Sequence, residues 1–235
     1  MFHIWDCLAS VNRRNFARTH AGTGTDTTRQ ERPHAHSVAE TVAGGVAIVA
    51  DLGIDRLVSY RIGPDGSLTR LAESALAPGA GPRHVALHPG GRFVFVMNEL
   101  DSTVVSLALD EASGRLTVID SKPTVPATAR DGNHCADIQI SPDGRFLYGS
   151  NRGHDSISVF SIDQQTGTLA LVVYASCGGA TPRNLALTPS GRHLFSANQN
   201  TDRISIFARD AATGRLADTG RSIDVGTPMC VKIVR

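Results

Sequence analysis

Histidine, arginine and acidic residues return at matching points along this chain, with side chains suited to an anionic, carbonyl-bearing molecule. One set stands at or just before the starts of apolar runs: His34, His36, Arg83, His84, His134, Arg183 and Asn184. A second set stands where later apolar runs end: Asp51, Glu99, Arg152 and Gln199. A guanidinium group binds phosphate or carboxylate through a fork of donors and can stabilise an oxyanion. Imidazole or carboxylate groups can activate water or move a proton.

A sequence repeat carries these side chains. An Asn or Asp recurs at the ends of apolar runs with spacings of 47, 53 and 47 residues, at Asp51, Asn98, Asn151 and Asn198. A turn glycine recurs with spacings of 48, 53 and 47 residues, at Gly66, Gly114, Gly167 and Gly214. Two independent landmarks that keep one period indicate a supersecondary unit repeated in tandem. Four aspartates recur in the loops between these landmarks, which indicates turn-forming side chains: Asp55, Asp101, Asp155 and Asp202.

Each unit has the composition of short β-strands joined by tight turns. Residues 92–97 and 145–150 are rich in β-branched and aromatic residues and follow glycine turns. Residues 156–162 alternate as half-buried strands do, and Ser-Pro-Asp-Gly at 141–144 suits a tight turn. Four short strands per unit form the blade of a β-propeller, so the sequence predicts an all-β fold. Propellers bind ligands around the central axis, so both polar sets should face one central region.

The repeat also sets the expected boundaries. We expect four complete blades at about residues 32–80, 81–131, 132–180 and 181–226, followed by a closing strand over 227–235. Residues 1–31 are basic and Thr-rich and show no alternation. This composition predicts an irregular segment or the remnant of a preceding blade.

Composition limits the partners and the compartment. A net charge of +1 gives no reason to expect nucleic acid or an acidic membrane surface as partner, and no apolar run has the length of a membrane span. The first residues lack the basic and apolar regions of a signal peptide. The four cysteines have no CxxC spacing, which favours reduced thiols and a cytoplasmic location: Cys7, Cys135, Cys177 and Cys230. We expect the last three to be buried, and the oligomeric state stays open.

Several motifs together resemble one protein family. Pro33–Val38 reads Pro-His-Ala-His-Ser-Val, Ala50–Asp55 reads Ala-Asp-Leu-Gly-Ile-Asp, and Gly81–His84 reads Gly-Pro-Arg-His. With Asn98-Glu99-Leu100 and the later motifs, the chain from about His20 to Val234 resembles the lactonase family of seven-bladed β-propellers. That family includes the propeller-type 6-phosphogluconolactonases and the carboxymuconate cyclases. Since only four complete blades are recognisable here, we expect a truncated gene product with open, aggregation-prone blade faces.

The resemblance implies an active-site group. By position in the motifs, the catalytic residues would be His36, Arg83, Glu99 and Arg152, and the substrate-binding residues would be His34, His134, Arg183 and Gln199. His34 could serve as the working imidazole in place of His36, because strand alternation would point both the same way. Without the resemblance, each residue alone would more often be a structural group that is satisfied by a neighbour.

The resemblance implies hydrolysis of a sugar lactone, with 6-phosphogluconolactone in the pentose phosphate route as the favoured substrate. Two alternatives stay open: a lactonising or cycloisomerising enzyme acting on a carboxymuconate, and an inactive propeller that serves as a binding module. We expect no cofactor. The histidines include zinc-ligand types, but His34, His36, His84, His134 and His154 would have to come from three blades, so we expect no metal. The expected partner is a small anionic lactone.

Overall fold

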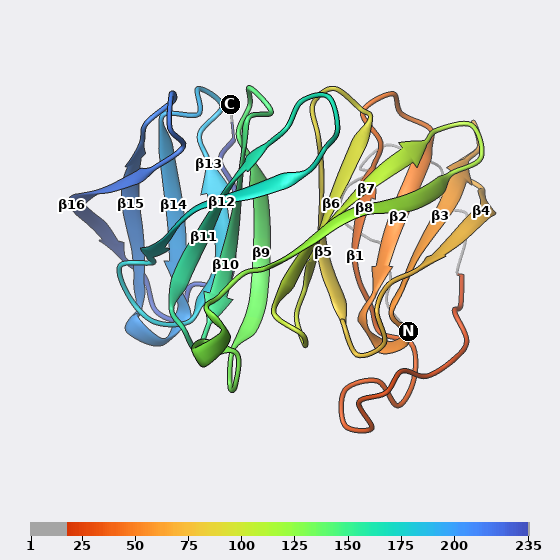
Figure 1. Cartoon of the computed structure of the whole chain (residues 1–235), viewed down its shortest axis with the longest axis horizontal. Coiled ribbons are helices and arrows are strands. Elements are labelled where there is room, and N and C mark those ends of the chain that lie inside the picture. The colour runs from red at the N-terminus through yellow and green to blue at the C-terminus, as the bar shows by residue number, and fades with distance from the viewer. Residues whose placement is uncertain (1–17, 235) are drawn as a thin grey trace.

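Each repeat folds as one four-stranded antiparallel sheet whose strands follow one another in chain order (Figure 1). The computed structural model describes residues 18–234. From inner to outer strand, the sheets consist of β1 (Ala35–Glu40), β2 (Val46–Asp51), β3 (Arg56–Ile62) and β4 (Leu68–Ala75); β5 (Pro82–Leu87), β6 (Phe93–Asn98), β7 (Thr103–Asp110) and β8 (Arg115–Pro123); β9 (His134–Ile140), β10 (Phe146–Arg152), β11 (Ser156–Ile162) and β12 (Leu169–Ser176); and β13 (Pro182–Leu187), β14 (His193–Asn198), β15 (Arg203–Arg209) and β16 (Leu216–Asp224). Short 3-10 helices occupy three loops: η1 (Leu52–Ile54), η2 (Ala127–Ala129) and η3 (Gln199–Thr201).

The sheets are arranged as the blades of a propeller. The inner strands β1, β5, β9 and β13 contact one another in succession. In Figure 1 these strands lie toward the middle of the molecule, while the outer strands β4 and β16 lie at its right and left ends. The predicted all-β propeller architecture is therefore confirmed. Residues 18–34, in contrast, form turns and irregular backbone in front of the first strand.

Apolar side chains fill the space between successive blades. The interface of the first two blades combines Ile48 and Leu57 with Val94 and Val96, all of which are buried. Equivalent clusters centred on Phe95 with Leu147, and on Tyr148 with Leu194, fill the next two interfaces. Successive side chains of a strand point to opposite faces of its sheet. Each sheet therefore packs one face on each adjacent blade. The interfaces therefore hold the starts of the inner strands at a fixed distance from one another.

In three of the four blades, an aspartate at a left-handed position binds the loop that follows the blade. Asp55, Asp155 and Asp202 have φ angles of 54°, 53° and 50°. Their carboxylates accept hydrogen bonds from the backbone of the loop that follows the blade: from Gly79 and Gly81, from Thr181 and from Thr227. Since the Gly81 and Thr181 loops lead directly into β5 and β13, these bonds fix where the next inner strand begins.

The C-terminal segment differs from its prediction. Residues 227–234, which the sequence predicts as a closing strand, form no strand. Thr227 has a φ of 48° and Pro228 carries no N–H, so neither residue suits a regular ladder. The segment uses a side chain instead, because the N–H of Val231 donates to Oδ1 of Asn184 at 2.7 Å.

Two of the three cysteines within residues 18–234 are buried. Cys135 and Cys177 are buried as expected, but the expectation for Cys230 was wrong, because that residue lies exposed in the non-strand segment. The predictions for residues 1–17, including Cys7, fall outside the described residues.

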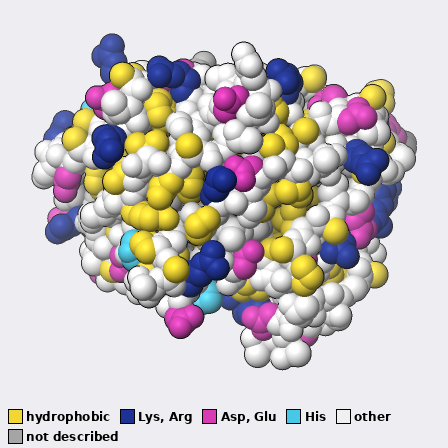
Figure 2. All heavy atoms as spheres, in the orientation of Figure 1, with side chains coloured by type: hydrophobic (Ala, Val, Ile, Leu, Met, Phe, Trp, Pro, Cys, Tyr) yellow, Lys and Arg dark blue, Asp and Glu magenta, His cyan; other side chains and the backbone are white. Residues whose placement is uncertain are grey.

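Figure 2 shows acidic and basic side chains interspersed over one face, with apolar side chains between them. Within residues 18–234, no helix is both long and apolar enough to cross a membrane.

Candidate active site

Strand pairing brings the starts of the inner strands and the ends of the second strands to one edge. Pro82 at the start of β5 pairs with Asn98 at the end of β6, and His134 at the start of β9 pairs with Arg152 at the end of β10. Antiparallel neighbours necessarily place these ends together. Glu99, directly after β6, therefore lies at the edge where Arg83 and Arg152 lie.

The pairing is interrupted at the residues that carry the site. His36 in β1, Arg83 in β5 and Arg183 in β13 each stand between two registered pairs where the register shifts by one residue. A β-bulge of this kind redirects a side chain away from the regular alternation. His34 lies just before β1 and His36 lies at the bulge, so the alternation of a regular strand does not apply to this pair.

Glu99 is the centre of an arginine cluster. Its Oε2 atom lies 2.9 Å from Nε of Arg83 and 3.1 Å from Nη2 of Arg152, and its Oε1 atom lies 2.6 Å from Nη2 of Arg29. Glu99 and Arg83 are 4% and 3% exposed. Burial works to raise the pKa of Glu99, but the guanidinium charges, with that of Arg152 the strongest, outweigh it and lower that pKa. The carboxylate is therefore an anchor for the arginines at neutral pH.

Arg83 also connects Glu99 to a histidine and aspartate pair. Its Nη1 atom donates to the carbonyl oxygen of Ala136 at 2.7 Å and lies 3.0 Å from Nε2 of His84. Because Nε2 then accepts, Nδ1 of His84 carries the proton that it donates to Asp137 at 2.7 Å. Burial and the charge of Arg152 lower the pKa of Arg83 to about 10, which leaves it cationic at neutral pH.

His36 stands beside this cluster. Its ring centroid lies 5.3 Å from that of His84, with the two planes tilted by 58°. The surrounding protein atoms, and then the positive charge of Arg83, lower the pKa of His36 to about 4. The residue is nevertheless exposed to solvent. At neutral pH it is therefore an uncharged imidazole within reach of a ligand, as a proton acceptor must be.

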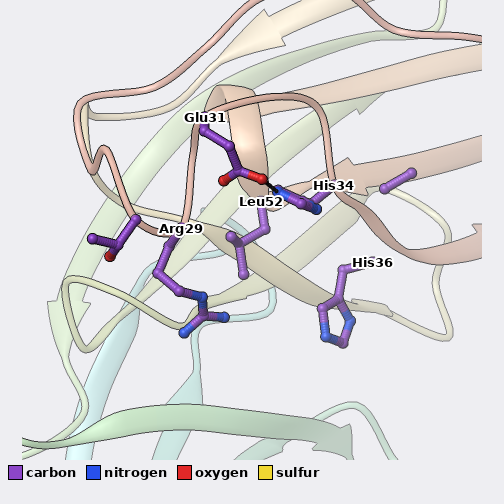
Figure 3. Close-up of a pocket in the computed structure, with 7 residues that line it drawn as sticks. Arg29, Glu31, His34, His36 and Leu52 are labelled. Carbon is purple, nitrogen blue, oxygen red and sulfur yellow. Dashed lines mark hydrogen bonds and ion pairs between the residues drawn. The ribbon is translucent and has the colours of Figure 1, made fainter.

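A pocket of about 330 Å³ opens beside His36. Figure 3 shows the side chains of Arg29 and His36 extending on either side of Leu52, while His34 is directed to Glu31. Nε2 of His34 lies 3.0 Å from Oε1 of Glu31. The volume is at the lower end of the range of about 300–1,000 Å³ found for small-molecule sites.

The other predicted substrate-binding residues differ in their relation to the arginine cluster around Glu99. Arg183 lies near the cluster, since its charge contributes to lowering the pKa values of Arg83 and Arg152. His134 is exposed and offers its backbone carbonyl to Nε of Arg152. Gln199 is half-buried in η3. Among the described residues, no hydrogen bond or ion pair joins the side chain of His134 or Gln199 to Glu99.

Asp51 and the strand-ending asparagines have structural partners. Asp51 is fully buried, and its Oδ1 atom accepts from the N–H groups of His34 at 2.7 Å and Gly53 at 3.1 Å. Its Oδ2 atom lies 2.5 Å from Nδ1 of His20. Asn198 donates to the carbonyl of Cys177 and to the hydroxyl of Ser205, 3.0 Å in both cases. These groups hold loops in place around the cluster.

Arg29 and Asp137 are the site residues that sequence reasoning missed. Arg29 lies in the segment predicted as irregular, and Asp137 lies inside a strand. The one available signal for Arg29 was its position just before the Pro33–Val38 motif. In the part of the chain that the structure describes, no group of three or more His, Cys, Asp or Glu side chains could hold a metal ion.

Comparisons with known proteins identify the family of this chain. The family model described as "Lactonase, 7-bladed beta-propeller" matches residues 5–233. The 6-phosphogluconolactonase of Bacillus subtilis (strain 168) is 40% identical over 165 residues, which is 70% of this chain and 47% of that protein. This chain therefore spans about half the length of the curated relative.

Solved structures show the same relationship. A protein from Lactobacillus plantarum superposes with a TM-score of 0.87 at 33% identity, covering 92% of this chain and 62% of its own. The periplasmic gluconolactonase of Pseudomonas aeruginosa superposes with a TM-score of 0.83 at 33% identity, covering 92% of this chain and 61% of its own.

Proposed function

Because this chain belongs to the seven-bladed β-propeller lactonase family, we propose that it hydrolyses a sugar lactone, converting 6-phosphogluconolactone to 6-phosphogluconate. The observation that carries the proposal is an uncharged, exposed His36 next to a buried cluster of arginines around Glu99. The first feature suits proton removal from water, and the second suits an anionic substrate and an anionic intermediate.

The chemistry is general-base ester hydrolysis. His36 accepts a proton from water while the water oxygen bonds to the lactone carbonyl carbon. The positive charges of Arg83 and Arg152 stabilise the resulting oxyanion, in a setting where burial strengthens the interaction. Collapse of the tetrahedral intermediate breaks the ring ester bond, and the protonated His36 returns its proton to the leaving alkoxide. The sugar acid is released with no net change in the enzyme.

Glu99 acts in this mechanism as a positioning residue. Both of its oxygens bind guanidinium groups, so neither oxygen is free to accept a proton from water. The pair His84 and Asp137 supports Arg83 from the other side. Arg183, His134 and Gln199 are the proposed contacts to the rest of the substrate, with His34 as a further contact from the first blade.

The mechanism uses no cofactor and no metal, since the arginines supply the positive charge that a metal would give. A cytoplasmic location and a place in the pentose phosphate pathway belong to the same proposal. The phosphorylated substrate named for the Bacillus relative and the unpaired thiols Cys135 and Cys177 support them. The arginines would also accept a carboxymuconate, but the names of the Bacillus and Pseudomonas relatives favour lactone hydrolysis.

The direct test is ring opening of freshly prepared 6-phosphogluconolactone by the purified protein and by His36→Gln. We expect turnover by the wild-type protein and a loss of about 100-fold or more in the variant. A wild-type protein that binds the lactone without opening it would support the binding-module alternative and refute the proposal.

A further inference from the structure

Arg29 differs from the other arginines around Glu99 in its origin and its exposure. It comes from the turn segment 24–34, which precedes the first blade, and it reaches across to Glu99, 70 residues later in the chain. Its side chain is 43% exposed, whereas those of Arg83 and Arg152 are 4% and 16% exposed. Of these three guanidinium groups, that of Arg29 has the most surface left for a ligand.

The segment that carries Arg29 is held firmly on the blade. Gln30, the next residue, is fully buried. Its Nε2 atom donates to the carbonyl of Leu52 at 2.8 Å and to Oδ1 of Asp55 at 2.7 Å. Its Oε1 atom accepts from the backbone N–H groups of Thr25 and Asp26, at 2.9 and 3.0 Å. A fully satisfied buried amide of this kind fixes the turn, and with it the start of the Arg29 side chain.

The same network connects the segment to the catalytic strand. Asp55 accepts from Gln30 and also from the N–H of Gly81 at 2.8 Å, two residues before Arg83. Arg29 and Arg83 are thus positioned by one carboxylate, and they bind opposite oxygens of Glu99.

The pocket beside Arg29 is lined by several nitrogen-bearing side chains. Among the described residues that line it, Arg29, His34 and His36 carry nitrogen groups and Glu31 carries the one carboxylate. Oε1 of Glu31 lies 3.0 Å from Nε2 of His34, so this carboxylate is engaged with another residue of the pocket wall. An anion entering the pocket would meet the free edge of the Arg29 guanidinium.

We propose that the pocket between Arg29 and His34 is a subsite for the anionic group of the substrate, at the end away from the lactone carbonyl. The inference rests on the proposed function, and it names a phosphoryl group as the ligand and Arg29 as the residue that selects for it. His36, on the other side of Leu52, then faces the lactone ring. Arg29 is in this view a specificity-determining residue, distinct from Arg83 and Arg152, which act at the carbonyl.

The test compares a phosphorylated and an unphosphorylated lactone. We expect Arg29→Ala to lower kcat/KM for 6-phosphogluconolactone by roughly 10- to 100-fold, because a charge-assisted contact to phosphate is lost. For gluconolactone the loss should stay below about 3-fold. Arg32→Ala is the matched control from the same segment; its side chain is 75% exposed and binds Glu31, and neither substrate should be affected. An equal loss on both substrates would show that Arg29 merely positions Glu99, and would overturn the subsite.

A second measurement separates this inference from the proposed function. If the wild-type protein opens neither lactone, the proposed function fails, and titration with inorganic phosphate in a calorimeter still decides the subsite. We expect wild-type and Arg32→Ala proteins to bind phosphate, and Arg29→Ala to bind at least about 10-fold more weakly. Absent binding in the wild-type protein, or equal binding in all three, would refute the subsite.

Discussion

His36 and Arg83 occupy the same structural position in neighbouring blades, each at a one-residue shift in the pairing between the inner and second strands. In a regular strand the side chain at this position would point to the face of the sheet opposite to that of its two neighbours. At a bulge it is redirected, and bulges are frequent next to active sites. The repeated irregularity therefore brings an uncharged imidazole and a buried guanidinium to the same region.

Replacement of Arg83 by alanine should abolish most of the activity without unfolding the protein. Glu99 keeps Arg29 and Arg152 as partners, so no carboxylate is left buried and unpaired. We expect kcat to fall by about 100- to 1,000-fold, as for the loss of one oxyanion donor. Kinetics and thermal melting, with the surface variant Arg56→Ala as control, check the prediction. A folded Arg83→Ala protein with full activity would remove Arg83 from the mechanism.

The pH dependence should identify His36 as the base. Its pKa is lowered to about 4, and only the uncharged ring accepts a proton. The value of kcat/KM should therefore rise as the pH increases through about 4 and be level from about pH 6 to neutrality. His36→Gln should lose this acid limb together with most of the rate. A limb centred near the ordinary pKa of histidine would contradict the assignment.

Glu99→Gln should destabilise the protein, because it leaves three guanidinium groups around an uncharged amide. Loss of one partner from a buried ion pair costs about 3–5 kcal/mol of unfolding free energy. The exposed bridge of Glu73 with Arg56 supplies a control, and Glu73→Gln should cost less than about 1 kcal/mol. Urea unfolding of the two variants measures the difference.

The same carboxylate predicts an acid-dependent stability. The pKa of Glu99 is lower in the folded state than its ordinary value of 4.5. Its contribution is therefore fully present above about pH 4.5 and is lost as the pH falls through the lower folded pKa. The wild-type protein should lose more stability than Glu99→Gln in that window; parallel curves for the two proteins would argue against the sign of the shift.

Much of the architecture followed from local rules in the sequence. The alternation of apolar and polar residues, together with tight turns such as that at Ser141–Gly144, predicted the strands. The equivalent positions of the motifs in successive blades predicted that Arg83, Glu99 and Arg152 would be neighbours. These features are local, and the tandem period places equivalent residues of each blade at one axis. Only the roles of these residues stay predictions.

What the sequence did not predict depends on contacts between distant segments. Arg29 reaches Glu99 from a segment without periodicity, so no pattern marked it. Asp55 and Asp155 were interpreted as turn formers, yet their carboxylates bind the loop of the following blade. Asp101 does bind its own turn, through the N–H and hydroxyl of Thr103. Asp101 stands one residue earlier in its loop than the other two, where Ser102 takes the left-handed position with a φ of 57°.

Chelation should leave the activity unchanged. The proposed mechanism draws its positive charge from arginine and its base from His36. Dialysis against a chelator, followed by assay in metal-free buffer, should retain the full rate within about 2-fold. Loss of activity that a divalent ion restores would replace this mechanism with one built on a metal.

A methyl group at Gly53 should uncouple the Arg29 segment from the blade. Gly53 lies in η1 directly beneath the segment, where a Cβ atom would overlap the carbonyl oxygen of Arg32 and crowd the N–H of His34. Because both obstacles are backbone atoms, the segment must shift, and Arg29 shifts with it. Misplacement by about 1 Å can cost roughly 100-fold in rate.

We therefore expect Gly53→Ala to lower kcat/KM for 6-phosphogluconolactone by about 10-fold or more. Proteolysis within residues 24–34 should become faster, while far-UV circular dichroism stays unchanged because this segment contributes no strand to the four sheets. Gly226→Ala is the matched control, since a Cβ atom there meets nothing within 4 Å. Wild-type kinetics in Gly53→Ala, despite faster proteolysis of the segment, would show that the position of Arg29 does not matter for catalysis.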